Sequence, residues 1–223
     1  MPQKLPDSLP VPHAILFDWD NTLVDSWGVI HDALNLTLKT YGHKPWTLSE
    51  TQTRVGKSLR DSFPDLFKDR WKEAADTFYE RFDEIHMKNL VPLEGVDDML
   101  RCFSGKGLFM GVVSNKRGPY LRKEAQHLGW NNHFKKLIGA LDASRDKPSP
   151  EPLEMALADS NISLGPNVWY VGDAPIDMEC AKTAGCTGIL LRKKAPTAEE
   201  FDPFLPTKHF SDCQTLCKHV DEL

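Results

Sequence analysis

Two features that are absent from this sequence exclude common classes of function. The formal net charge of its 223 residues is −5 at pH 7, so the chain lacks the basic excess that nucleic-acid-binding proteins use. No apolar run approaches the roughly 18 to 20 residues that a membrane-spanning helix needs. We therefore expect a globular protein that binds neither nucleic acid nor membranes.

Cysteines are sparse and show no pairing pattern. The five are Cys102, Cys180, Cys186, Cys213 and Cys217. They form an odd, scattered set without a C-x-x-C motif, which is typical of reduced cysteines in a cytosolic protein. Residues 1–7 are polar and proline-rich, without the apolar stretch of a secretion signal. We expect a cytoplasmic monomer or homodimer whose length allows one or two domains.

The most informative segment is an apolar run that ends in two carboxylates. Residues 13–17 form a short run that follows prolines, which favours a buried strand over a helix. Because side chains at i and i+2 of a strand point the same way, we expect Asp18 and Asp20 to project as a pair. Two adjacent carboxylates repel each other unless a cation or a shared proton compensates them. The pair is therefore costly as structure and useful as chemistry.

The following segment, residues 25–91, is predicted to be helical. Apolar residues recur at helical spacing over 27–41, and Gly42 follows as a stop signal. Residues 47–50 have the capping-box pattern that starts a second helix. A longer helix is expected over 68–88, where apolar residues form one stripe.

Strands and helices alternate in the remainder of the chain. Strands are expected at 108–113, 137–140, 168–171 and 187–191, and helices at 119–129, 151–159, 175–184 and 212–220. This alternation predicts an α/β fold, a doubly wound, Rossmann-like parallel sheet with helices on both faces. Residues 1–24 and 92–223 would form the α/β core domain, and 25–91 a small inserted α-helical cap domain. Residues 195–206 are expected to form a loop, to which no function is assigned.

Three of the expected strands end in polar residues. These are Asp18 and Asp20, Ser114 and Asn115, and Asp173 with Asp177. Ligands of open α/β sheets bind at the carboxyl ends of the strands, so we expect these side chains to meet there, together with Lys147 from a loop. Several carboxylates without a thiolate cluster favour a hard cation such as Mg2+ over zinc. Taken singly, each residue also fits an ordinary role in a helix cap, a turn or a solvated loop.

Taken in order, these groups resemble the four motifs of the haloacid dehalogenase-like hydrolase superfamily. The motifs read Asp18-x-Asp20-x-Thr22, Ser114-Asn115, Lys147-Pro148 and Gly172-Asp173-x-x-x-Asp177. The chain is most similar to the phosphoglycolate phosphatase and β-phosphoglucomutase branch, whose helical cap follows the first strand. The resemblance covers nearly the whole chain.

The resemblance implies a role in phosphoryl transfer for three residues. Asp18 would be the nucleophile that forms an aspartyl-phosphate, which suits a carboxylate because it is ionised at neutral pH. Asp20 would protonate the leaving alcohol and then activate the attacking water. Lys147 would neutralise charge on the nucleophile and on the transferring group.

The resemblance also implies which residues bind the metal ion and the phosphate. A carboxylate oxygen of Asp18, the backbone carbonyl of Asp20 and the side chain of Asp173 would hold Mg2+. Asp177 would hold the water shell of the metal or support its neighbours. The phosphoryl oxygens would be bound by Ser114 and by backbone amides near Asn21 and Asn115.

Asp20 also distinguishes between reactions within the superfamily. Members that cleave carbon–halogen or phosphonate bonds lack an acid two residues after the nucleophile, because no alkoxide needs a proton. Its presence favours phosphate esters. We therefore expect an enzyme, a Mg2+-dependent phosphatase that hydrolyses a small phosphorylated metabolite, with phosphoglycolate-like substrates as the leading candidates.

Two alternatives remain open. A β-phosphoglucomutase-like phosphosugar mutase keeps the same four motifs, so they do not separate hydrolysis from transfer. A non-catalytic phosphate-binding regulatory protein would share the fold but usually has a damaged motif, and none is visible here.

Substrate specificity is expected to reside in the helical segment. Arg54, Lys57 and Arg60 surround a glycine at a predicted helix junction, where the cap of related enzymes reaches the leaving group. The alternative is a solvated face, because acidic residues lie close by in the sequence.

Overall fold

A parallel sheet forms the centre of the computed structural model, which describes residues 9–223. The strand order is β5-β4-β1-β6-β7-β8, and every neighbouring pair is parallel. The strands are β1 (Ala14–Phe17), β4 (Phe109–Arg117), β5 (Lys136–Ala140), β6 (Val168–Gly172), β7 (Thr187–Leu191) and β8 (Lys208–Phe210). The predicted α/β class is confirmed.

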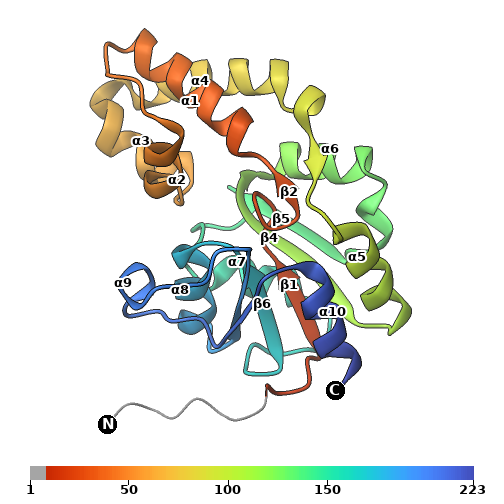
Figure 1. Cartoon of the computed structure of the whole chain (residues 1–223). Coiled ribbons are helices and arrows are strands. Elements are labelled where there is room, and N and C mark those ends of the chain that lie inside the picture. Colours follow the sequence, from red (N-terminus) through yellow and green to blue (C-terminus); the bar gives the residue numbers. More distant parts are fainter. Residues whose placement is uncertain (1–8) are drawn as a thin grey trace.

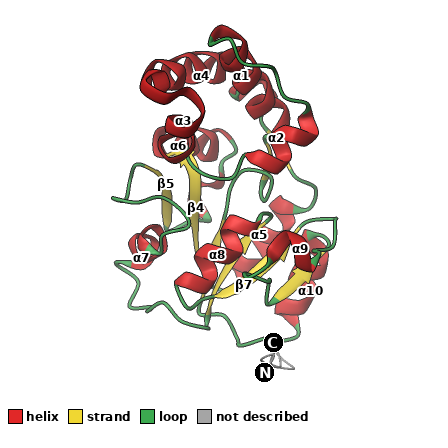
Figure 2. Ribbon diagram, turned by 90° about the vertical axis from the view of Figure 1, so that its left-hand side faces the viewer, coloured by secondary structure: helices red, strands yellow, loops and turns green. Residues whose placement is uncertain are grey.

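Helices cover both faces of the sheet, as Figures 1 and 2 show. Alternation along β1 sends Ile15 and Phe17 to one face and Ala14 and Leu16 to the other. The first face packs against α5 (Val96–Gly105), α6 (Gly118–His127) and α10 (Cys213–Asp221). The second packs against α7 (Glu151–Leu157) and α8 (Pro175–Thr183). A strand covered on both faces must be apolar throughout, which explains the short continuous run before Asp18.

Four helices pack around a separate hydrophobic cluster above the carboxyl edge of the sheet (Figure 1). They are α1 (Trp27–Thr40), α2 (Leu48–Arg54), α3 (Leu59–Phe67) and α4 (Trp71–Ile85), here called the four-helix unit. Its two connections to the rest of the chain pair with each other as a short antiparallel ladder, β2 (Val24–Asp25) with β3 (Val91–Pro92). The predicted capping box between Thr47 and Glu50 is present. The division into two domains at residues 24 and 92 stays a prediction.

The helix expected over 68–88 is shorter. Lys68 has a φ of 51°, in the left-handed region, which ends α3 and separates it from α4. One 3-10 turn, η1 (Lys68–Arg70), precedes α4, and another, η2 (Met87–Asn89), follows it.

Several elements of the described chain were not predicted from the sequence. Helix α5 and edge strand β8 are two of them, and α9 (Ala198–Phe201) lies within the segment 195–206. A further 3-10 turn, η3 (Trp130–Asn132), follows α6. Among residues 9–223, no helix is long and apolar enough to cross a membrane.

Candidate active site

The carboxyl ends of β1 and β6 bring three carboxylates together. Phe17 lies opposite Val171, and the Asp18 amide donates to the Val171 carbonyl at 2.8 Å. Asp173 follows β6 directly, and Asp177 lies in the first turn of α8. One oxygen from each of the three carboxylates lies within 4.8 Å of the others. The predicted meeting of the first and fourth motifs is therefore observed.

Lys147 lies between two of these carboxylates. Its Nζ is 2.8 Å from Asp18 Oδ1 and 2.8 Å from Asp177 Oδ1, and its side chain is only 2% exposed. Burial opposes the charged lysine, but Asp177 and Asp18 outweigh that effect and raise the pKa of Lys147. Tyr170 also donates its hydroxyl to Asp177 Oδ1 at 3.2 Å.

The three carboxylates make a site of excess negative charge. Burial is the largest cause that raises the pKa of Asp18, and despite the opposing effect of Lys147 it reaches about 6. Burial, together with Asp177 and Asp18, holds the pKa of Asp173 well above its usual range. One lysine cannot balance three carboxylates, so the protonated forms are favoured in the absence of a further cation.

The donor set fits a divalent cation such as Mg2+. Although Asp18 Oδ1 lies 2.8 Å from Lys147 Nζ, this buried atom accepts no well-directed hydrogen bond from any described residue. All the candidate ligand atoms are carboxylate oxygens, the type that hard cations prefer.

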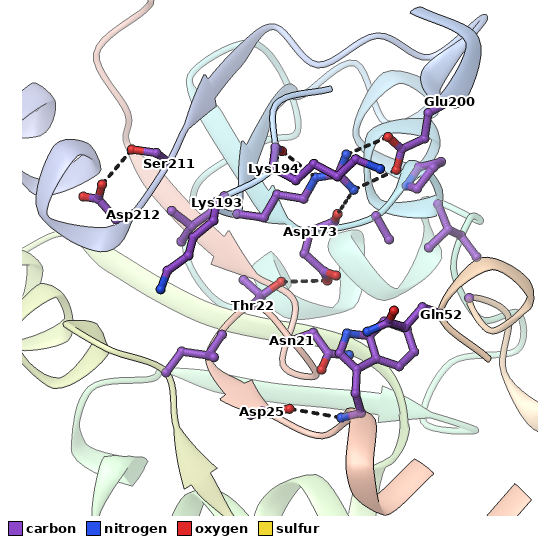
Figure 3. A pocket seen from close by; sticks show the side chains of 18 of the residues that line it. Asn21, Thr22, Asp25, Gln52, Asp173, Lys193, Lys194, Glu200, Ser211 and Asp212 are labelled. Carbon is purple, nitrogen blue, oxygen red and sulfur yellow. Dashed lines mark hydrogen bonds and ion pairs between the residues drawn. The ribbon is translucent and has the colours of Figure 1, made fainter. Parts of the chain in front are cut away.

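Neighbouring groups fix the orientation of the other two carboxylates. Asp173 accepts a hydrogen bond from the Thr22 hydroxyl at 3.2 Å, as Figure 3 shows. Asp177 is fully buried, and its Oδ2 accepts the Ala174 amide at 3.1 Å. A Cβ on Gly172 would lie 2.3 Å from Asp177 Cγ. Only glycine therefore leaves room for this aspartate beside the end of β6.

Asp20 lies beside the cluster, but its carboxylate points to other groups. Asp20 Oδ1 is 2.7 Å from Lys116 Nζ and accepts the Ser26 hydroxyl. Strand β1 ends at Phe17, so the i, i+2 rule no longer governs the direction of Asp20. The expectation that Asp18 and Asp20 project as a pair from one strand is therefore corrected. A metal contact through the Asp20 carbonyl stays a prediction.

The predicted phosphate-binding residues line the same space with different surroundings. Ser114 is buried, and its Oγ accepts the Lys116 amide at 3.2 Å. Asn21 has a φ of 63°, and its amide donates to the Val24 carbonyl at 2.7 Å. The Asn21 amide is thus already engaged within its turn.

Asn115 connects Lys147 to the four-helix unit. Its Nδ2 donates to the Gly56 carbonyl at 3.0 Å, and its Oδ1 accepts the Lys147 amide at 3.1 Å. The side chain therefore holds the loop of Lys147 against the loop between α2 and α3.

The three predicted cations of the four-helix unit have different environments. Arg54 is exposed and lies 3.4 Å from Glu50. Arg60 forms an ion pair with the buried Asp146, with its Nε 2.8 Å from Asp146 Oδ2, and so joins the unit to the core. Lys57 lines the cavity described next, and no described carboxylate lies within ion-pair distance of it.

A cavity of about 110 Å³ separates the carboxylates from the four-helix unit. Its polar wall contains Asp18, Asp20, Asn21, Ser114, Asn115, Lys147 and Asp173. Its aromatic wall contains Trp27, Phe78, Tyr79, Phe82 and Tyr120. The cavity adjoins a wider groove that shares Asn21, Lys57 and Asp173 with it. Figure 3 shows the wider groove, with Asn21 and Asp173 among the residues that line it. The small cavity therefore has polar groups on one wall and mostly apolar side chains on the other.

Sequence reasoning missed several charged residues at this site. Lys116 and Arg117 directly follow the second motif, and both line the cavity. Glu124 and His86 lie behind Lys116 and are buried. The signal for Lys116 was its position two residues after Ser114, on a strand that enters the site. The residues behind it gave no such signal, because they belong to the helix face of α6 and the end of α4.

Comparison with known proteins places this arrangement in a family. Residues 15–191 match the model of the haloacid dehalogenase-like hydrolases. The chain is 30% identical over 195 residues to a phosphoglycolate phosphatase of Xylella fastidiosa, covering 85% of this chain and 84% of the relative. It is also 30% identical to a pyrophosphatase of Anoxybacillus flavithermus, covering 78% of this chain and 80% of the relative.

A solved structure agrees with this assignment at the level of the fold. The haloacid dehalogenase-like family protein of Streptococcus pneumoniae superposes with a TM-score of 0.80 over 92% of this chain and 97% of its own, at 20% identity. The match over residues 15–191 shows that the chain belongs to the haloacid dehalogenase-like hydrolases.

Proposed function

We propose that this protein is a Mg2+-dependent phosphatase that hydrolyses a small phosphorylated metabolite through an aspartyl-phosphate on Asp18. Its class, a phosphoric monoester hydrolase, follows from the family and from the phosphatases among its relatives. The observation that carries the proposal is the position of Asp18, which lies close to Lys147, Asp173 and Asp177 and lines a cavity that opens into the wider groove.

In the first step, an Asp18 carboxylate oxygen forms a bond to phosphorus, and the bond from phosphorus to the leaving oxygen breaks. Asp20 lines the same cavity and gives a proton to that oxygen. In the second step, Asp20 takes a proton from a water molecule, whose oxygen attacks phosphorus and releases Asp18 and inorganic phosphate. Both steps use one carboxylate for covalent chemistry and another for proton transfer.

The surrounding residues lower the repulsion between an anionic nucleophile and an anionic phosphate. Asp18 and Asp173, with Asp177 and the Asp20 carbonyl in support, would hold a divalent cation, which would supply positive charge at the transferring group. Lys147 supplies a second positive charge from the opposite side of the carboxylate cluster. The Ser114 hydroxyl and the backbone amides near Asn115 bind the phosphoryl oxygens, and near Asn21 this role falls to neighbouring amides, because the Asn21 amide donates to Val24.

The four-helix unit acts as a cap that selects the leaving group. The small volume of the cavity favours a short leaving group over a sugar. Lys57 and Arg117 both line it, and neither lies within ion-pair distance of a described carboxylate, although the Arg117 guanidinium lies over the Tyr79 ring at 3.9 Å. Two uncompensated cations favour a leaving group that carries its own negative charge, as phosphoglycolate does. Arg54 is too exposed for this role, and Arg60 acts through Asp146.

A phosphate screen tests the proposal. We expect purified protein with Mg2+ to release phosphate from phosphoglycolate faster than from hexose phosphates, and the Lys57→Met variant to raise KM for phosphoglycolate. Pyrophosphate is the second substrate to include, because its leaving group is also a small anion. Conversion of hexose 1-phosphate to 6-phosphate with a bisphosphate activator would instead favour the mutase. No release from any substrate would favour a phosphate-binding regulatory protein.

The location of this activity follows from its substrate. A small phosphorylated metabolite is found in the cytoplasm, and the scattered thiols suit a reducing compartment. The protein would act there as a monomer or homodimer without nucleic-acid or membrane partners.

A further inference from the structure

A buried ion-pair network ends on the carboxylate of Asp20. Lys116, at the carboxyl end of β4, places its Nζ 2.7 Å from Asp20 Oδ1 and 2.6 Å from Glu124 Oε2. The Lys116 side chain is 5% exposed and that of Glu124 is 1% exposed. The lysine is therefore fixed between two carboxylates, one of which lines the cavity.

Glu124 is held in turn by two further groups. Trp19 donates its indole Nε1–H to Glu124 Oε2 at 2.7 Å. His86 Nδ1 lies 2.8 Å from Glu124 Oε1. Glu124 lies on α6, Trp19 precedes Asp20, and His86 ends α4, so the network connects the turn after β1 to three other elements. Every member has contacts that restrict its side chain to one position.

A network of this kind is poorly explained by stability alone. Buried ion pairs are commonly no more stabilising than apolar residues of the same volume, because the charges lose their hydration. Part of the surroundings of Lys116 is apolar, because its Nζ lies over the Phe82 ring at 5.3 Å. An apolar side chain at this position would therefore have a partner to pack against. Instead, the network leaves one positive charge in contact with the carboxylate that transfers protons.

We propose that Lys116, itself held by Glu124, is a positioning residue that fixes the carboxylate of Asp20 at the leaving-group side of the cavity. This inference rests on the proposed role of Asp20 as the proton donor and acceptor. Lys116 acts through Asp20 and has no separate task in the reaction. Proton transfer requires the donor within hydrogen-bond distance of the leaving oxygen. The reaction is therefore slower when the Asp20 side chain is not held in position.

A double-mutant cycle tests this role. Phosphate release is measured for the wild type, Lys116→Met, Asp20→Asn and the double variant, with the best alkyl phosphate of the screen. We expect Lys116→Met to lower kcat on the order of 10²-fold, with little change in KM. In the Asp20→Asn background the same change should cost less than about threefold, because the group on which Lys116 acts is gone.

A leaving group that needs no proton gives a second readout. With 4-nitrophenyl phosphate, whose phenolate leaves unprotonated, the loss of kcat/KM on Lys116→Met should be at least about tenfold smaller than with the alkyl phosphate, because kcat/KM reports the first step and not the later activation of water by Asp20. Equal losses with both substrates and in both backgrounds would overturn the proposal and leave Lys116 a purely structural residue.

Controls separate misfolding from mispositioning. Glu124→Gln keeps the shape of its side chain and removes one charge, so it tests the network if Lys116→Met does not fold. It should lower kcat in the wild type and have no further effect with Asp20→Asn. Lys123→Met is the matched control, because Lys123 is exposed on the same helix, 3.5 Å from Asp83, and should leave kcat unchanged. Full activity of Asp20→Asn would instead refute the proposed role of Asp20.

Discussion

Asp18 illustrates how a single residue can serve chemistry at the expense of stability. The residue is 8% exposed, and its carboxylate has two other carboxylates within 4.8 Å. Burial, opposed by Lys147, raises its pKa from 3.8 to about 6. Between these two values the folded protein holds a proton that the unfolded chain has released. Stability therefore falls as the pH rises through this window, and the loss is complete above it.

The first prediction concerns the Asp18→Asn variant without metal. Because the amide removes the buried charge, we expect the variant to be more stable than the wild type above about pH 7, by up to about 3 kcal/mol. The difference should disappear below about pH 4, where Asp18 is protonated in both states. Thermal unfolding over this pH range measures it, and phosphate release should be lost. A variant less stable than the wild type at about pH 8 would contradict the argument.

The second prediction concerns the cation. Mg2+ should raise the Tm of the wild type, because binding to the folded state alone stabilises it. Asp173→Asn should reduce this shift, since it removes one of the three converging carboxylates. The shift is measured without substrate and so does not depend on turnover. Removal of divalent cations with a chelator should abolish phosphate release. An equal shift in both proteins would place the ion elsewhere.

At the level of secondary structure, the ends of β1, β4 and β6 position most of the residues proposed to be catalytic. The end of β6 shows how little space is available, because a Cβ on Gly172 would lie 2.3 Å from Asp177 Cγ. Strand β6 and helix α8 can approach this closely only without a side chain at that position. The close approach brings Asp177 to within 2.8 Å of Lys147.

The third prediction is that Gly172→Ala displaces the start of α8. We expect a loss of kcat on the order of 10²-fold, because small misplacements of catalytic groups have large effects. Overpacking should also lower stability by about 1 to 3 kcal/mol. Gly165→Ala is the matched control, since no atom lies within 4 Å of its added Cβ. Phosphate release measures kcat and thermal unfolding measures the stability of both variants. Equal losses in Gly172→Ala and Gly165→Ala would refute the steric argument.

Considered as a whole, the molecule has its cavity at the boundary between two hydrophobic clusters. One cluster lies within the four-helix unit, and the other covers a face of the sheet. Polar contacts cross the boundary where the two parts meet. Arg60 pairs with Asp146 at 2.8 Å, and Asn115 donates to the Gly56 carbonyl at 3.0 Å. Because Asp146 precedes Lys147, these contacts connect the position of the helices to the lysine that is proposed to act in catalysis.

The fourth prediction compares Arg60→Met with Arg54→Met. Loss of Arg60 leaves the buried Asp146 without its ion-pair partner, so we expect a stability loss of about 1 to 3 kcal/mol. We also expect a decrease in kcat/KM of about tenfold, because the helices no longer hold the cavity closed. Arg54 is exposed, and its removal should change neither quantity measurably. Equal effects of the two substitutions would show that the Arg60 ion pair does not hold the two parts together.

Much of the fold could be predicted because its signals are local. Alternating apolar strands and amphipathic helices appear as patterns in short windows, and the parallel sheet follows from their order. Helix α5 had the same kind of signal, since Val96, Met99, Leu100 and Phe103 are buried at helical spacing. Strand β8 has only one buried residue, Phe210, and such a short edge strand has no pattern of its own.

The candidate site was predictable to the extent that it follows strand ends. Asp18 and Asp173 come directly after buried strands, Ser114 lies among the last residues of β4, which extends beyond the predicted end at 113, and in a parallel sheet those ends share one edge. Direction within the site was less predictable. Asp20 belongs to a turn beyond the strand, where the Lys116 ion pair and the Ser26 hydroxyl orient it. Neither partner could be inferred from spacing.

The order of the strands along the chain determines which residues can lie at the carboxyl edge of the sheet. A residue that follows a buried parallel strand leaves the sheet at that edge. Which of them touch depends on contacts between remote segments, such as Lys116 with Glu124 or Arg60 with Asp146. Those pairings arise only when packing brings the segments together and removes water from between the charges. Burial then determines which cations are compensated and which, like Lys57, remain available to a ligand.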